Sequence, residues 1–140
     1  ELEKNKEIFE ILQRNENIIF HGYYKDINDF YKQCDVFCIS SIDDGFGMVV
    51  PEAMANSLPC IVTENVGASS LIKNNANGFV VPIQADKEIE IALEYYYNNR
   101  EAVKRMGQQA YKDYLLYMKN NNYQDSLNEA LKNEKFGVGK

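Results

Sequence analysis

The feature that most limits the possible folds of this chain is a regular alternation between two kinds of segment. Short apolar runs, typical of strands, alternate with stretches whose apolar residues recur at the three-to-four-residue spacing of a helix. The strand-like runs are residues 17–21, 35–39, 59–63 and 78–81. The helical stretches are residues 2–13, 26–34, from about 48, near 69–74, from 86, from about 101 and near 122–133. This order predicts an α/β fold in which helices cover both faces of a parallel sheet.

The composition indicates one folded domain. The 140 residues are 45% hydrophobic and 26% charged, which is enough apolar material for a core and too much for a disordered chain. We expect residues 1–134 to form this domain and residues 135–140 to be a flexible tail. No apolar run approaches the roughly 20 residues of a membrane-spanning helix, and the first residues lack the apolar stretch of a signal peptide.

Charge and cysteine content narrow the partners and the compartment. A formal net charge of −6 argues against a nucleic-acid partner and against contact of this domain with an anionic membrane. The three cysteines, Cys34, Cys38 and Cys60, include no Cys-x-x-Cys pair, and the last two fall in strand-like runs. We therefore expect structural thiols in a reducing, cytoplasmic protein.

Ligands of parallel α/β sheets bind at the carboxyl ends of the strands, so the loops that follow the strands are the candidate sites. These loops are residues 22–26, 40–47, 63–69 and 82–86. In the second loop Gly45 and Gly47 bracket Phe46, and a helix begins close to Met48 because Pro51 must lie in its first turn. The glycines let the backbone turn sharply and approach a ligand, whose oxygens the free N–H groups of the helix start can bind.

Two carboxylates flank this turn. Asp44 precedes it and Glu52 lies about one turn into the helix, so both can face one pocket. A carboxylate accepts hydrogen bonds from both hydroxyls of a vicinal diol, and the set as a whole suits a nucleotide sugar. In the alternative interpretation, Asp43 and Asp44 cap the helix and Glu52 complements its dipole. The residue types alone leave both interpretations open.

The same stretch resembles the signature of the retaining GT-B glycosyltransferases, the group with the Glu-x7-Glu motif. The resemblance rests first on residues 41–47, 52–55 and 58–59, and then on residues 19–22, 31–36, 67–72 and 77–82 in the same order. It extends over roughly residues 17–118. It implies a Rossmann-like C-terminal half of a GT-B fold, here without its first strand.

The resemblance also implies roles for individual residues. Glu52 would hold the donor ribose and Asp44 the transferred sugar, as the catalytic pair. Gly22 and Tyr23 would lie beside the base. The residues whose backbone would hold the sugar hydroxyls and the diphosphate are Gly45, Phe46, Gly47, Met48 and Val49. Transfer would retain the anomeric configuration and would need no metal or other cofactor.

This chain departs from the family pattern in several places. Asp44 is one methylene shorter than the usual Glu, and Ser70 stands where many relatives have an acid. Compared with the family pattern, this sequence lacks the first strand of the domain and the acceptor-binding N-terminal domain. We therefore expect a donor domain that is inactive alone, with a nucleotide sugar and that N-terminal domain of the same protein as partners. Any attachment to the inner face of the membrane would involve other parts of the full-length protein.

Three alternatives to a glycosyltransferase donor domain belong to other classes of protein. The chain would be a sugar-nucleotide epimerase relative, a non-catalytic GT-B-like binding or scaffold domain, or a receiver-type flavodoxin-like domain. The Gly-Phe-Gly turn at residues 45–47 fits the last of these poorly. Outside the motif, Tyr23 and Tyr24 are candidates for base stacking. His21 is expected to be a structural neighbour of Gly22 and not a catalytic base. Lys73 is expected to be an ordinary solvated lysine.

Overall fold

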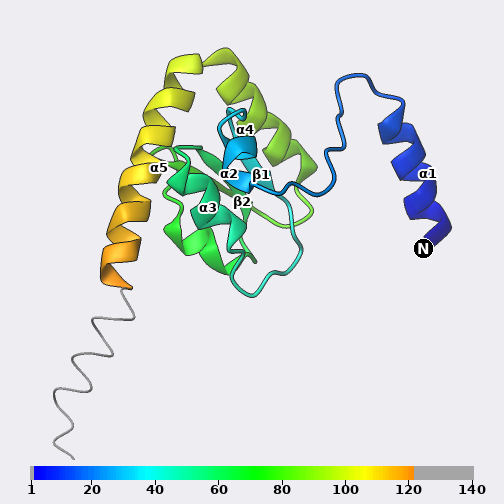
Figure 1. Cartoon of the computed structure of the whole chain (residues 1–140). Helices are drawn as coiled ribbons and strands as arrows, with labels where there is room; N and C mark the ends of the chain where they lie inside the picture. The colour runs from blue at the N-terminus through cyan, green and yellow to red at the C-terminus, as the bar shows by residue number, and fades with distance from the viewer. Residues whose placement is uncertain (1, 122–140) are drawn as a thin grey trace, which may run out of the picture. The chain divides into compact units, whose positions relative to one another are not determined.

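The computed structural model describes residues 2–121, which form two compact units that divide between Phe30 and Tyr31 (Figure 1). The predicted helix near 122–133 and the predicted tail at 135–140 lie outside the described residues.

The first unit consists of the helix α1 (Leu2–Gln13) and a long irregular segment that leads into the short helix α2 (Ile27–Tyr31). The carboxylate of Asp26 accepts a hydrogen bond from the N–H of Asn28 at 3.0 Å, as expected for the residue that begins a helix. Aromatic rings provide much of the packing: Phe9 lies 4.8 Å from Phe20, and His21 lies 4.8 Å from Phe30, between ring centroids.

The predicted strand at residues 17–21 is wrong. In the described structure this segment has no regular secondary structure, and the N–H of Ile18 bonds locally to the carbonyl of Asn15. Ile19 and Phe20 are 72% and 48% exposed. A strand is stable only when a neighbouring strand takes up its N–H and C=O groups, and no described strand pairs with this segment.

The second unit is built on a parallel sheet of three described strands in the order β1-β2-β3. These are β1 (Phe37–Ile39), β2 (Cys60–Thr63) and β3 (Gly78–Val81). Cys60 is in register with Phe37 on one side and with Gly78 on the other. Each strand lies within or close to its predicted range, so the parallel sheet is confirmed.

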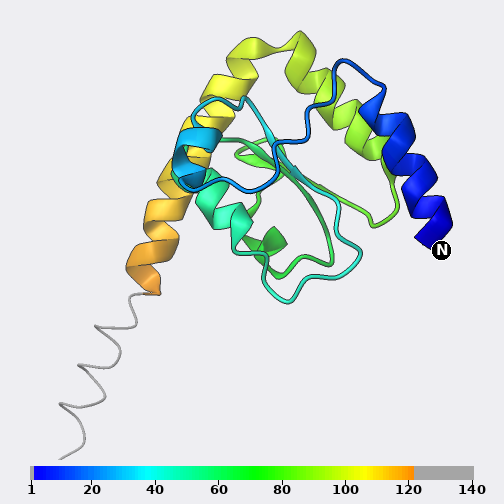
Figure 2. The ribbon, with the colours of Figure 1, turned by 45° about the vertical axis from the view of Figure 1, so that its right-hand side comes forward.

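Helices cover both faces of this sheet, as predicted. They are α3 (Val49–Ala55), the 3₁₀ helix η1 (Gly67–Leu71), α4 (Asp86–Asn98) and α5 (Arg100–Asn120). Successive residues of a strand point to opposite faces, and Cys60 and Val62 accordingly pack with α3 whereas Ile61 packs with α4. Figure 2 shows α5 running beside α3, and buried residues of α5 enter both core clusters.

Burial follows the predicted pattern in α3 but not everywhere. Helical spacing in the sequence predicts that Val50, Ala53 and Met54 point inward, and all three are fully buried. Helical spacing in the sequence also predicts that Ala92, Leu93 and Tyr96 point inward. Leu93 is nevertheless 44% exposed, because Ala92 and Tyr96 occupy the face of α4 that meets the sheet.

The predicted burial of the cysteines is also confirmed for one strand residue and wrong for the other. Cys60, on the central strand, is fully buried, and burial raises the pKa of its thiol well above the ordinary value. Cys38, expected to be a buried apolar residue, is exposed because it lies on β1, at the edge of the three-stranded sheet. Cys60 therefore fits the predicted structural role, and the prediction of burial for Cys38 is wrong.

We expect Tyr96→Phe to raise the free energy of unfolding by about 1 kcal/mol, because it removes a buried hydroxyl that has no partner. Tyr96 is 1% exposed, and its hydroxyl forms no hydrogen bond with any described residue. Urea unfolding of the two proteins measures the difference. The control is Tyr97→Phe on the same helix, where the side chain is 81% exposed and no change is expected. A destabilised Tyr96→Phe protein would contradict the prediction and indicate a buried water on the hydroxyl.

Candidate functional site

The loop between β1 and α3 (residues 40–48, the motif loop) is joined by backbone hydrogen bonds to the loop that follows β2. The N–H of Gly67 donates to the carbonyl of Asp44 at 3.1 Å, and the N–H of Ala68 donates to the carbonyl of Phe46 at 2.6 Å. Asp44 and Val66 form an isolated parallel bridge. The ladder thus continues beyond the carboxyl ends of β1 and β2 and holds the motif loop there.

The turn in this loop requires glycine at one of its two predicted positions. Gly47 has φ +77°, and a Cβ there would lie 2.5 Å from Cγ1 of the buried Val66. Gly45 does not have a positive φ, and a Cβ there would meet no heavy atom within 4 Å. Gly67 is also needed, since its Cβ would overlap the carbonyl oxygen of Gly45. The fold therefore explains Gly47 and Gly67, and it leaves open space around Gly45.

The start of α3 presents a run of backbone donors. The helix begins at Val49, with Pro51 in its first turn as predicted. No described residue accepts a hydrogen bond from the N–H groups of Phe46, Gly47, Met48 or Val49. Met48 is the N-cap, and no side chain caps the helix, so the alternative in which Asp43 or Asp44 caps it is wrong. The four N–H groups remain available to a ligand.

The two candidate carboxylates lie on either side of these donors in the chain. Asp44 is half-buried beside the turn, and its Cγ would lie 3.7 Å from a Cβ built on Gly47. Glu52 is exposed on the first turn of α3. The structure thus places both predicted residues at the carboxyl end of the sheet.

Tyr31 supports Glu52 from the core. Its hydroxyl lies 3.4 Å from Oε2 of Glu52 and 3.5 Å from the carbonyl oxygen of Val49, and it donates to them. Tyr31 is 5% exposed, and burial together with the negative charge of Glu52 raises its pKa to about 12. The phenol therefore stays protonated and remains a donor at neutral pH. Helical periodicity marks Tyr31 only as a core residue, and nothing in the sequence connects it to Glu52.

Gly22 and Tyr23 belong to the first unit. Gly22 has φ +65°, the conformation that glycine adopts without strain, and Tyr23 is 94% exposed. Their predicted role beside the base remains a prediction.

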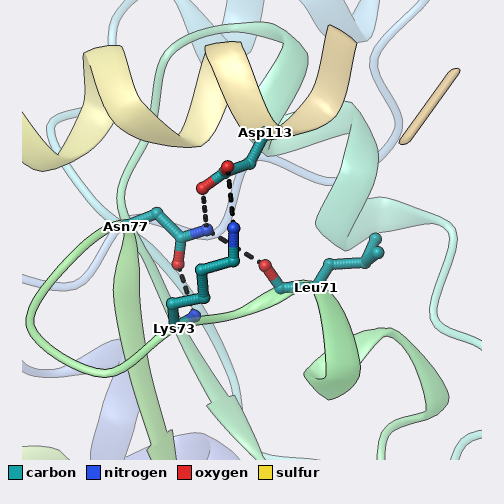
Figure 3. Close-up of polar contacts among 4 residues, drawn as sticks. All are labelled: Leu71, Lys73, Asn77 and Asp113. Atoms are coloured by element: carbon teal, nitrogen blue, oxygen red, sulfur yellow. Dashed lines mark hydrogen bonds and ion pairs between the residues drawn. The ribbon is translucent and has the colours of Figure 1, made fainter. Parts of the chain in front are cut away.

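A polar network centred on the buried Asn77 joins the segment before β3 to α5 (Figure 3). Asn77 is fully buried, and its Nδ2 donates to the carbonyl of Leu71 at 3.0 Å and to Oδ2 of Asp113 at 2.8 Å. Its Oδ1 accepts from the N–H of Lys73 at 2.7 Å, and Nζ of Lys73 lies 3.0 Å from Oδ1 of Asp113. The side chain of Lys73 is 60% exposed, as predicted for a solvated lysine, and it also forms an ion pair with Asp113.

Two opposing effects act on the carboxyl group of Asp113. Burial raises its pKa, but hydrogen bonds from Lys73, Asn77 and Gln109 outweigh burial and leave the pKa below its usual value. Asp113 is therefore ionised at neutral pH, and it anchors α5 to the end of the sheet.

Two cavities among the described residues of the second unit lie away from the motif carboxylates. One of about 390 Å³ is at the amino ends of β1 and β2, and its lining includes Cys34 and Arg100. Another of about 210 Å³ lies between η1 and α5, beside Lys73 and Asp113. Neither of these two cavities is lined by Asp44 or Glu52.

Between residues 2 and 121, no three His, Cys, Asp or Glu side chains gather closely enough to form a metal site. Over the same residues, no helix has both the length and the apolar character to cross a membrane.

The second unit has a parallel sheet with helices on both faces, and it has the fold of the C-terminal domain of a GT-B glycosyltransferase. The family model for "Glycosyl transferases group 1" matches residues 1–113, and the chain belongs to this family.

Known proteins agree with this assignment. The chain is 32% identical to EpsD of Bacillus subtilis over 108 residues, which are 77% of this chain and 28% of EpsD. The C-terminal domain of LpcC, a group 1 glycosyl transferase of Francisella tularensis, superposes with a TM-score of 0.73 at 23% identity, covering 86% of this chain and 63% of that one. HepE of Anabaena, solved with UDP-glucose, has a TM-score of 0.77 at 20% identity, covering 92% and 38%. The chain thus spans under a third of EpsD.

Proposed function

We propose that this chain is the donor-binding domain of a retaining glycosyltransferase and that it binds a nucleotide-diphospho-sugar along the motif loop and the first turn of α3. The observation that carries the proposal is the run of N–H groups at residues 46–49, which have no described acceptor and are flanked by Asp44 and Glu52. Backbone donors stabilise a diphosphate, and carboxylates accept hydrogen bonds from sugar hydroxyls. Membership of the family and the UDP-glucose complex of HepE support this choice of ligand.

In this proposal the carboxylates and the backbone N–H groups bind different parts of the donor. Glu52 accepts hydrogen bonds from the ribose hydroxyls, and the Tyr31 hydroxyl restrains Glu52 for that purpose. Asp44 accepts from hydroxyls of the transferred sugar and stabilises positive charge that develops at its anomeric carbon. The N–H groups act on the diphosphate leaving group, so we propose that transfer needs no metal ion or other cofactor.

The remaining parts of the proposed site lie outside the motif loop and α3. We propose that Gly22 and Tyr23 lie beside the base. A separate N-terminal domain of the full-length protein would hold the acceptor. Because transfer with retention needs both halves, we expect the domain alone to bind a donor nucleotide without turning it over.

The experiment is a calorimetric titration of the full-length protein with UDP, GDP and ADP, together with assays of sugar transfer with and without a chelator. For Glu52→Gln we expect roughly 10-fold weaker nucleotide binding, since a hydrogen bond to a charged group contributes about 1.5 kcal/mol or more. For Asp44→Asn we expect a large loss of turnover with nucleotide affinity within about 2-fold, since its partner is the sugar.

The matched control is Glu90→Gln, which neutralises an exposed carboxylate on α4 and should change neither value. Wild-type affinity in Glu52→Gln together with wild-type turnover in Asp44→Asn would contradict the assignment. Nucleotide binding with no transfer to any acceptor would favour the scaffold interpretation.

A further inference from the structure

Phe46, between the two glycines of the motif loop, packs against a residue far along the chain. Its ring stacks on that of Tyr117 near the end of α5, with centroids 6.2 Å apart and planes inclined by 22°. This is an offset stack, within the range of separations at which aromatic rings attract one another. Both side chains are half-buried.

Both partners of this stack are held by other contacts. The carbonyl of Phe46 accepts the 2.6 Å hydrogen bond from Ala68, which holds one backbone group of the turn but not the ring. On α5, Asp113 lies one helical turn before Tyr117, on the same side of the helix, and is bound to Asn77 and Lys73. Tyr117 is therefore attached to a part of α5 that is anchored to the sheet.

The glycines make this stack important. Gly45 and Gly47 have no side chains, so neither restrains the turn through side-chain packing. The ring of Phe46 is the side chain that ties the middle of the turn to the rest of the unit. A freely moving turn would lose conformational entropy on binding a ligand, and a restrained turn loses less.

We infer that Tyr117 is a positioning residue: by stacking on Phe46 it holds the Gly45–Gly47 turn so that the N–H groups at residues 46–49 point toward the donor. The inference rests on the proposed function for its ligand. It assigns to the C-terminal part of α5 a role in the donor site, although no residue of α5 contacts the donor in the proposal.

The test compares Tyr117→Ala with Tyr117→Phe in the full-length protein. We expect Tyr117→Ala to weaken nucleotide binding by roughly 3- to 10-fold, the equivalent of one aromatic pair, and to raise the KM for the donor. Tyr117→Phe keeps the ring and should bind within about 2-fold of wild type. The control is Tyr111→Ala, which removes an exposed ring from the same helix and should bind like wild type. Because Phe46 mediates the effect, Tyr117→Ala should weaken binding no further in a Phe46→Leu background.

A second measurement does not depend on any ligand. Hydrogen exchange of the peptide that contains residues 40–48 should be faster in Tyr117→Ala than in wild type and unchanged in Tyr117→Phe. If wild type binds no nucleotide, the proposed function fails and the exchange rates still decide the positioning role. If Tyr117→Ala binds and exchanges like wild type, or if Tyr117→Phe is as impaired as Tyr117→Ala, the inference is overturned.

Discussion

Gly107→Ala is expected to lower the free energy of unfolding by about 1–2 kcal/mol, although the same change in an exposed helix raises it by about 1 kcal/mol. Gly107 lies in the middle of α5 and is buried. A Cβ there would overlap the carbonyl oxygen of Ser57 and lie 3.3 Å from Cδ of Pro59. Overpacking of this kind typically costs 1–3 kcal/mol, which outweighs the gain in helix propensity.

The carbonyl that meets Gly107 is not free to move away. Ser57 has φ +60° and ends α3, where its N–H bonds to Met54 and the N–H of Leu58 bonds to Ala53. This paired arrangement is the Schellman motif, which holds the residue after a helix in the left-handed conformation. The overlap must therefore be relieved by a shift of α5.

Equilibrium unfolding in urea measures the effect of Gly107→Ala, and Gln108→Ala provides the control on an exposed position of the same helix. The control should change stability by no more than about 0.5 kcal/mol. A Gly107→Ala protein as stable as wild type would mean that α5 can move away from Ser57 without cost.

Asn77→Ala is expected to lower the free energy of unfolding by about 3 kcal/mol, the largest effect predicted for this chain. The change removes three hydrogen bonds at a fully buried position. It also leaves the carbonyl of Leu71 and the N–H of Lys73 without the side-chain partner that they have in the native state. An unsatisfied buried group costs about 1–3 kcal/mol, so the loss exceeds that of an ordinary surface asparagine.

Thermal and urea unfolding measure this loss, with Asn98→Ala as the control at an exposed asparagine. The acid side of the pH profile gives a second readout. The folded pKa of Asp113 is lowered, so its contribution is present above the ordinary carboxyl pKa of about 4 and is lost as pH falls through the folded value. Asp113→Asn should therefore destabilise the protein more at pH 7 than at pH 3. Equal destabilisation at both pH values would contradict the network.

The candidate site shows how far local sequence signals reach. Pro51 places the start of α3 within a residue or two, because a proline is tolerated only in the first turn. Two glycines in a strand-end loop predict a turn, and Gly47 does have the positive φ that favours glycine. The requirement at Gly67 was not predictable in this way, because it depends on the carbonyl of Gly45 on another loop.

The predictions of strand and burial that were wrong have a common origin. The run at residues 17–21 has the composition of a strand, but a strand depends on a neighbour and none of the described strands pairs with it. Leu93 has helical periodicity, but Tyr96 and Ala92 occupy the contact with the sheet. Cys38 lies in an apolar run, but that run forms an edge strand. Each error concerns which neighbour a segment finds.

The sequence by itself determined the α/β class, the three described parallel strands and the position of the motif loop. These follow from periodicity, proline and glycine placement, and residue chemistry, all of which act over a few neighbouring residues. Only the tertiary structure decided that Tyr31 restrains Glu52, that Tyr117 stacks on Phe46, and that Ser57 leaves no room for a side chain at Gly107. These contacts join residues distant in the chain, and their energies exist only once packing has brought the groups together.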